Sequence, residues 1–236
     1  MQIDITFDYR KDSLGRDPDS ASASLRTMHA RLWSKQLPNG EVFQLSENGL
    51  GPYLTYEGKM GHIFLSSDSI ANSYNDRKRL AAVIHEIDPS LISSFLDLNS
   101  TIGAFILFPG NRIEGKTTIN GERGFNHLIA DRFDLTLECI RRHYDNIDSP
   151  LGTVLKRYSE FFTLFCDFRS YVDFFLLNDL VSEDYSAVKY FNFIPEIFVS
   201  SPVPESIASY LAYREGSMSF VRNRNSRIES WARNGP

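Results

Sequence analysis

A polar segment at residues 108–126 directly follows the most apolar run of the chain and is rich in groups that could bind an anion. Its cations and amides are Arg112, Lys116, Arg123, Asn111, Asn120 and Asn126. Ligands often lie beyond strand ends, where polar loops carry function more often than the core does. The segment therefore predicts a site for a phosphate-bearing ligand. The alternative is a glycine-rich surface loop whose charges are simply solvated.

Acidic side chains at the start of the next segment could perform acid–base chemistry. On a helix, Asp131, Asp134 and Glu138 would share one face, with Arg142 one turn further on. A carboxylate beside an Arg- and Asn-rich loop could orient a water molecule or stabilise a positive transition state. We select Asp131 as the candidate catalytic residue because it is nearest that loop. The alternative is an ordinary helix face, since early acids and late arginines complement the helix dipole.

A third group of candidate binding residues lies near the N-terminus. Arg26, His29 and Trp33 would share one face of a helix that ends near Lys35. Such a face could stack a base and bind a phosphate. The alternative places Trp33 in the core with His29 as its partly buried neighbour.

Two further sets have a structural explanation beside the functional one. Eight aromatic residues at 158–175 predict a hydrophobic core rather than a cofactor site. A basic C-terminal set could follow a phosphate backbone, or could be a solvated terminal helix. Its members are Arg222, Arg224, Arg227, Trp231 and Arg233.

The elements that must position these residues follow from hydrophobic periodicity. Strand-like alternation comes first and helical periods follow. We expect strands at 3–7, 42–45, 53–56, 62–65 and 101–108, and helices at 22–35, within 66–88, from about 127, at 150–180, 204–214 and 219–233. Residues 56–59 suit a hairpin turn. The pattern predicts one α+β domain over residues 1–236, with a short mixed sheet in the N-terminal half and a helical C-terminal half.

Composition excludes several classes of protein. No apolar run is long enough to span a membrane, and the N-terminus does not resemble a secretory signal. Two cysteines give no disulfide framework. We therefore expect a cytoplasmic protein that does not bind membranes. The phosphate-binding and dinucleotide-binding loops, the nucleophile elbow and the zinc-protease motif are absent, and the five histidines lack metal-ligand spacing. We therefore expect no cofactor and no metal. A net charge of −5 argues against binding nucleic acid through bulk charge, but leaves room for a local basic groove.

Four stretches resemble an uncharacterised bacterial protein family with a domain of unknown function. They are residues 24–40, 64–70, 108–113 and 131–142, and the last, DRFDLTLECIRR, is the most distinctive. The resemblance covers nearly the whole chain and carries over no catalytic residues. More loosely, the chain is similar to accessory antiphage proteins, which include DNA glycosylases that excise modified bases. Residues 61–74 are also similar to the middle of ADP-ribosyltransferase folds, without the glutamate-bearing strand expected downstream.

These observations favour an N-glycosylase that releases a modified or unmodified base from DNA through a cationic sugar. Asp131 would orient water or stabilise the cation, and Asn126 would bind the base or the water. Arg112, Lys116 and Arg123 would bind phosphates, and Trp33 or Phe125 would fill the gap left by the extruded base. One alternative is an ADP-ribosyltransferase that places Ser66, Ser67 and Tyr74 around NAD. The other is a non-catalytic module that binds a partner protein.

Overall fold

A four-stranded antiparallel sheet organises the fold in the computed structural model, which describes residues 3–47, 54–58, 61–75 and 77–234. The strands β1 (Leu45–Ser46), β2 (Leu54–Gly58), β3 (Gly61–Ser69) and β4 (Phe105–Pro109) are neighbours in chain order. The first half of β3 pairs with β2, from Gly58↔Gly61 to Leu54↔Leu65. The second half pairs with β4, from Leu65↔Pro109 to Ser69↔Phe105. The expected α+β class is confirmed.

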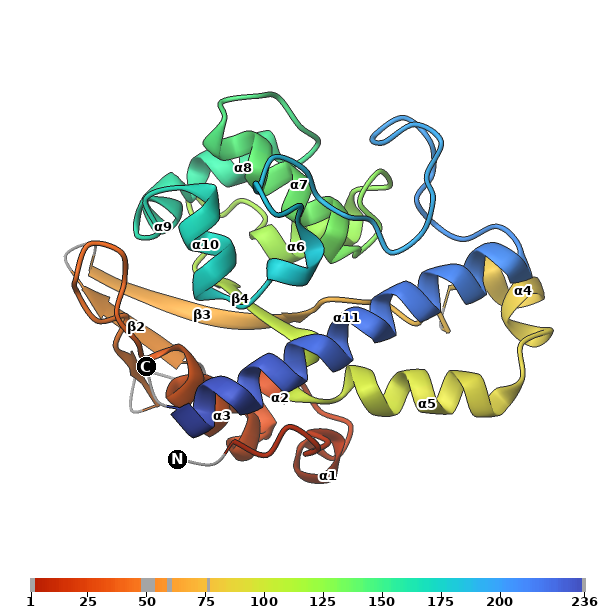
Figure 1. The fold of residues 1–236 in the computed structure, drawn as a ribbon, viewed down its shortest axis with the longest axis horizontal. Helices are drawn as coiled ribbons and strands as arrows, with labels where there is room; N and C mark the ends of the chain where they lie inside the picture. Colours follow the sequence, from red (N-terminus) through yellow and green to blue (C-terminus); the bar gives the residue numbers. More distant parts are fainter. Residues whose placement is uncertain (1–2, 48–53, 59–60, 76, 235–236) are drawn as a thin grey trace.

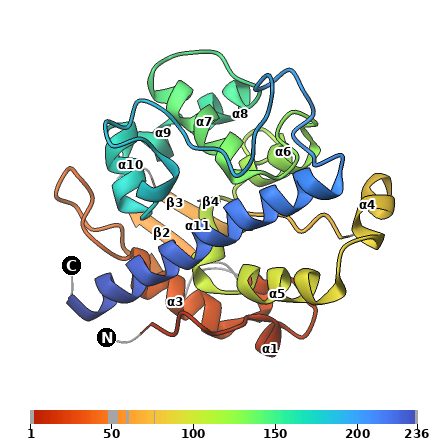
Figure 2. The same ribbon diagram turned by 45° about the vertical axis from the view of Figure 1, so that its right-hand side comes forward.

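Helices lie on both sides of this sheet (Figures 1 and 2). One group comprises α1 (Arg10–Ser13), α2 (Pro18–Ala21), α3 (Ala23–Trp33) and α5 (Pro89–Asn99). The group on the other side comprises α6 (Ile119–Phe125), α7 (Phe133–Tyr144), α8 (Gly152–Arg157), α9 (Ser159–Thr163) and α10 (Phe168–Phe174). The sheet is thereby covered on both faces, in keeping with the complete burial of β4.

The first long helix forms as its sequence predicts. Ser22 caps α3, because its hydroxyl accepts a hydrogen bond from the backbone N–H of Leu25 at 3.1 Å. The expected stripe of Leu25, Met28 and Leu32 is buried. Helix α3 thus turns one apolar face into the core.

The C-terminal helix α11 (Ile207–Asn234) is continuous, whereas two separate helices were expected. It crosses the molecule diagonally in both views (Figures 1 and 2). Gly216 stands near the expected break, and a Cβ there would lie 2.0 Å from the carbonyl oxygen of Phe191. This glycine serves a close backbone contact and does not interrupt the helix.

The buried strand begins later than predicted, because residues 102–104 form the 3-10 helix η2 (Ile102–Ala104). The backbone N–H of Gly103 donates to Oδ1 of Asn225 at 2.9 Å, and a Cβ on Gly103 would lie 2.3 Å from that oxygen. This contact with α11 holds η2 out of the sheet.

Four other predicted elements differ from the structure, and the first is the strand expected at 42–45, of which only Leu45 lies in β1. Residues 3–7 form no strand, since their backbone groups pair locally, as in the 3.3 Å bond from the N–H of Phe7 to the carbonyl of Asp4. Residues 66–69 extend β3, so the helix expected within 66–88 shrinks to η1 (Lys78–Leu80) and α4 (Ala81–His85). The helix expected at 150–180 is divided into α8, α9, α10 and η3 (Asn178–Leu180). Tyr53 of the strand predicted at 53–56 and Lys59 of the predicted turn lie outside the described residues.

The division at 150–180 has a local cause. Cys166 adopts a left-handed backbone (φ 65°), and Asp167 then caps α10 by accepting from the N–H of Ser170 at 2.7 Å. The eight aromatic residues of this region are nevertheless all buried, as predicted: Tyr158, Phe161, Phe162, Phe165, Phe168, Tyr171, Phe174 and Phe175. Within the described part of the chain, no helix combines the length and apolarity that crossing a membrane requires.

Candidate functional site

The loop between α6 and α7 presents Asp131 at the protein surface. Residues 119–125, expected to be loop, form α6, whose Thr118 cap accepts from the N–H of Gly121 at 3.3 Å. Ala130 and Asp131 both have left-handed backbones, with φ of 50° and 61°. Two successive non-glycine residues in this region store strain, and such strain gathers at functional sites.

Two side chains from the segment after β3 hold the Asp131 carboxylate. Asn72 Nδ2 and Arg77 Nη2 each lie 3.3 Å from Asp131 Oδ2. The side chain of Asp131 is 24% exposed, as is that of Arg77. The carboxylate is therefore fixed in direction while still open to solvent.

Beneath Asp131, the buried guanidinium of Arg123 joins β3 to α7. It pairs with the carboxylate of Asp68 and donates to Thr136 Oγ1 at 2.9 Å. It also donates to the carbonyls of Ser69 at 3.0 Å and Asp131 at 3.3 Å. Arg123, predicted to bind phosphate, thus has its donors occupied inside the protein.

Burial and two charged neighbours shift the pKa of the Asp68 carboxyl. Burial raises its pKa, the positive charge of Arg123 opposes that rise, and the negative charge of Asp131 adds to it. The negative charge of Asp131 therefore acts on Asp68, which lies on the other side of Arg123.

The three carboxylates expected on one helix face, those of Asp131, Asp134 and Glu138, do not form a single group and contact different residues. Asp131 precedes α7, which begins at Phe133. Asp134 is fully buried and forms a salt bridge with Arg132. Glu138 accepts from Arg141 and Arg142 at 2.8–2.9 Å, and these pairs outweigh the effect of its burial and lower its pKa.

The residues around Asp131 divide between surface and interior. Phe125 is 85% exposed and directly follows Gly124, which faces the Asp131 carboxylate. Asn126 is half-buried, and its side chain bonds to the Pro150 carbonyl at 3.3 Å and the Leu128 N–H at 3.0 Å. Among the predicted residues, Arg123 contacts Asp131 directly, by donating to its carbonyl, and Phe125 follows the glycine that faces the carboxylate.

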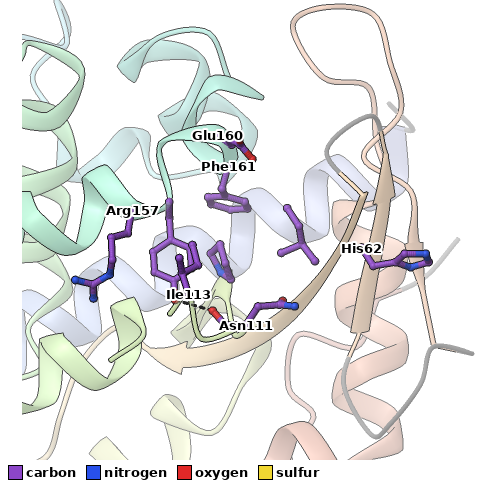
Figure 3. Close-up of a pocket in the computed structure, with 9 residues that line it drawn as sticks. His62, Asn111, Ile113, Arg157, Glu160 and Phe161 are labelled. Carbon is purple, nitrogen blue, oxygen red and sulfur yellow. Dashed lines mark hydrogen bonds between the residues drawn. The ribbon is translucent and has the colours of Figure 1, made fainter. Parts of the chain in front are cut away.

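Of the predicted anion-binding segment 108–126, residues 110–118 remain a loop, which lies at the other end of β3. Arg112 and Lys116 are exposed, and Lys116 pairs with Glu114 at 2.6 Å. Asn111 lines a pocket of about 130 Å³ with Ile63, Pro109, Ile113, Tyr158 and Phe161, at whose edges His62, Arg157 and Glu160 stand (Figure 3).

The N-terminal candidates lie mainly inside the protein. Trp33 is fully buried, and its Nε1–H donates to Nδ1 of the buried His29 at 3.0 Å. Burial, together with the charge of Arg224, lowers the pKa of His29 to about 3. Arg26 is half-buried and donates to the carbonyl of Asp19 at 3.0 Å. Lys35 lies over aromatic rings, and the same two causes lower the pKa of its amine to about 7.

Sequence reasoning did not identify Asp19, whose carboxylate binds the backbone of β3 at Ser67, where β2 no longer pairs with that strand. Its Oδ2 accepts from the N–H of Ser67 at 2.8 Å, and its Oδ1 accepts from the Ser67 hydroxyl. Asn120 donates to the hydroxyl of Ser66 at 2.9 Å. Burial raises the pKa of Asp19 to about 6 against these hydrogen bonds. The sequence signal was the Asp17-Pro18 start of a helix, which indicated a turn and gave no sign of the strand it contacts.

Tyr74, grouped with Ser66 and Ser67 in the NAD hypothesis, is fully buried, and its hydroxyl donates to the Ala130 carbonyl at 3.0 Å. It therefore supports the strained turn that carries Asp131.

The C-terminal basic residues do not form one free edge. Arg224 is fully buried and donates only to the carbonyls of Gly103, Phe105 and Phe175 at 2.6–3.1 Å. The others pair with acids: Arg222 with Glu215, Arg227 with Asp179, and Arg233 with Glu229. Among the residues that the structure describes, no group of three or more His, Cys, Asp or Glu side chains could hold a metal ion.

Comparison with known proteins gives one match. The model of a family of unknown function, DUF6994, matches residues 3–228. No curated protein and no solved structure matches the chain, so nothing supports the looser similarity to DNA glycosylases. The matched range includes Asp131 and the residues that hold it.

Proposed function

We propose that this chain, which belongs to the family of unknown function DUF6994, hydrolyses the N-glycosidic bond of a nucleotide in DNA, with Asp131 as its catalytic carboxylate. The observation that carries the proposal is a partly exposed carboxylate on a strained turn, fixed by Asn72 and Arg77. Carboxylates in such fixed positions stabilise sugar cations and orient water in glycoside hydrolysis.

The reaction requires a base to leave and a water molecule to add. As the bond between the base nitrogen and C1′ breaks, its electron pair goes to the base and the sugar becomes cationic. The Asp131 carboxylate stabilises this cation and accepts a proton from the water that attacks C1′, and that proton then passes to the nitrogen of the released base, which restores the carboxylate. Asn72 and Arg77 act as positioning residues, since each contacts the same oxygen of Asp131.

Phe125 supplies an exposed apolar side chain at the end of α6, next in sequence to the glycine that faces this carboxylate. Its side chain is 85% exposed, and Gly124 brings the end of α6 against Asp131. An apolar side chain can occupy the gap that an extruded nucleotide leaves in the base stack. Arg112 and Lys116, both exposed, are the proposed phosphate contacts.

The test is release of a base from modified and unmodified DNA, followed by alkali to break the strand at abasic sites. Asp131→Asn should lower the rate roughly 100-fold, because the neutral amide neither stabilises the cation nor accepts the proton. Asp145→Asn is the matched control, since Asp145 is an exposed carboxylate paired with Arg141. Equal rates for wild type and Asp131→Asn would contradict the assignment, as would intact DNA across the panel. A rise in melting temperature with NAD and none with DNA would favour the ADP-ribosyltransferase alternative.

A second candidate function is binding of a partner protein without catalysis. Two large apolar side chains protrude from the segment that precedes α11: Phe193 is 86% exposed and Val199 is 70% exposed. Exposed apolar side chains close together on one segment are typical of interaction sites. Under this alternative, Phe193→Ser abolishes a stable complex captured from lysate, whereas Asp131→Asn leaves that complex intact.

A further inference from the structure

A small pocket lies where β3 begins and β4 ends, against α8 and α9. Ile63 and Pro109 contribute from the strands, and Tyr158 and Phe161 contribute two aromatic rings. Its volume is about 130 Å³. An engineered apolar cavity of about 150 Å³ holds one benzene molecule, so this pocket is the size of a single six-membered ring.

Asn111 places a polar group in this apolar surrounding. Its Oδ1 accepts from the N–H of Phe64 at 2.5 Å, and its carbonyl accepts from the hydroxyl of Tyr158 at 2.6 Å. These bonds fix the direction of the side-chain amide, and no described residue accepts a hydrogen bond from its Nδ2. Asn111 and Phe161 stand on opposite sides of the pocket in Figure 3. Asn111 thus offers a positioned donor to the edge of a ring that lies near Phe161.

The charged residues at the edges leave the interior neutral. In Figure 3 the guanidinium of Arg157 and the ring of His62 point away from the pocket. Arg157 donates to the carbonyl of Thr117 at 2.6 Å, and His62 is 3.5 Å from Glu57. A charged ligand would lose its hydration without gaining an opposite charge, so the pocket favours a neutral one.

We propose that this pocket binds a neutral six-membered heteroaromatic ring of the pyrimidine type, with a ring nitrogen or carbonyl accepting from Asn111 Nδ2. Aromatic contacts with Phe161 and Tyr158 supply the binding energy, and the Asn111 donor selects rings that carry an acceptor.

The site is separate from Asp131 and does not depend on the proposed hydrolysis. Ile63 and Ser69 are six residues apart on β3, or about 20 Å at strand spacing. Asn72, which contacts Asp131, lies beyond the far end of that strand. Loss of ring binding and loss of base release are therefore distinguishable by substitution at either end of β3.

Ligand-observed NMR titration of the full chain tests the proposal, with pyrimidine as the probe and benzene as the ring without an acceptor. We expect pyrimidine to bind the wild type with a Kd of about 1 mM or tighter, which is within reach of a six-atom ligand. Asn111→Asp retains an oxygen to accept from Phe64 but removes the amide donor. It should weaken pyrimidine binding about tenfold and leave benzene binding unchanged.

A filling substitution keeps the test independent of Asn111. Ile113 lines the pocket and is 36% exposed, so Ile113→Trp should fill the space without disturbing the core, and neither ring should then bind. Ile147→Trp, at an exposed position outside the pocket, is the matched control and should bind both rings as the wild type does. Circular dichroism confirms that each variant is folded. Pyrimidine binding that is absent in the wild type, unchanged by Asn111→Asp, or unchanged by Ile113→Trp would overturn the proposal.

Discussion

Gly124 faces Asp131 so closely that a Cβ on residue 124 would lie 3.2 Å from Oδ1 of the carboxylate. Gly124 is a helical residue of α6 and is not among the glycines with positive φ, so its backbone does not require glycine. Residue 124 is a glycine because the Asp131 carboxylate leaves too little space for a Cβ there.

Gly124→Ala should therefore lower the rate of base release without lowering the stability of the protein. Alanine favours a helix over glycine by roughly 0.5–1 kcal/mol, so the melting temperature should stay level or rise. The new methyl group must displace the Asp131 carboxylate by a few tenths of an ångström and weaken its bonds to Asn72 and Arg77. We expect base release to fall about tenfold. Gly152→Ala is the control, because its Cβ would approach Oδ1 of Asp148 at 3.3 Å, on a different loop. An unchanged rate of base release in Gly124→Ala would contradict the assignment of Asp131 as the catalytic residue.

Replacing Asp134 should destabilise the protein strongly. Its carboxylate pairs with Arg132, both side chains are fully buried, and it accepts from the N–H of Phe191 at 2.9 Å. Asp134→Ala leaves a buried guanidinium unpaired, which costs about 3–5 kcal/mol. Urea unfolding measures the loss. Asp145→Ala, in an exposed pair, should cost less than about 1 kcal/mol.

The same substitution should loosen the segment before α11. Arg132 also donates to Asn192 at 2.7 Å and to the Pro202 carbonyl at 2.9 Å, so the buried pair ties that segment to α7. Limited proteolysis of Asp134→Ala should cut within 191–204 faster than in the wild type. Equal cleavage rates would show that other contacts hold it.

His29 should make the protein less stable in mild acid. Its pKa is about 3 in the folded state and about 6.5 in the unfolded chain, so between these values the unfolded state binds a proton that the folded state excludes. Stability is complete above pH 6.5 and falls as the pH drops, by about 2 kcal/mol at pH 5. His29→Gln can still accept a hydrogen bond from Trp33 but has no ionisable ring. In urea unfolding, its free energy of unfolding should therefore fall less between pH 7 and pH 5 than that of the wild type. A pH dependence identical to that of the wild type would contradict the assignment.

Lys35 should react as a nucleophile at neutral pH. Its Nζ lies 4.6–5.3 Å from the ring centres of Phe174, Trp33 and Trp231, and its pKa of about 7 leaves much of the amine unprotonated. An acylating reagent at pH 7 should modify it at least tenfold faster than the exposed Lys116, as peptide mass spectrometry would show. Trp231→Ala should open the amine to water and shift the reaction to higher pH. Equal labelling of the two lysines would contradict a lowered pKa.

The predictable part of the fold consisted of elements whose signals are local. Ser22 with the stripe from Leu25 to Leu32 specified α3, and the aromatic residues at 158–175 specified core. Elements set by distant partners were not predictable. η2 depends on Asn225, more than 120 residues away in sequence, and the glycine that suggested a break in α11 is explained by its close contact with the backbone of Phe191.

The candidate site shows the same limit. The residue types singled out Asp131, but a helical period placed it with Asp134 and Glu138, whereas Asp131 stands before the helix on a left-handed turn. Arg123 resembled a phosphate-binding residue because its sequence neighbours are polar. Its burial follows from Asp68 and Thr136, which only the tertiary fold brings to it.

The anchoring of α11 has a consequence for how the chain is made. Arg224 and Asn225 supply the hydrogen-bond partners of the backbone at Gly103, in η2, and at Phe105, the first residue of the buried edge strand β4. During translation, that strand leaves the ribosome roughly 120 residues before the side chains that complete it. The interior around β4 therefore stays incomplete until α11 has been synthesised, and this part of the fold cannot form stepwise from the N-terminus.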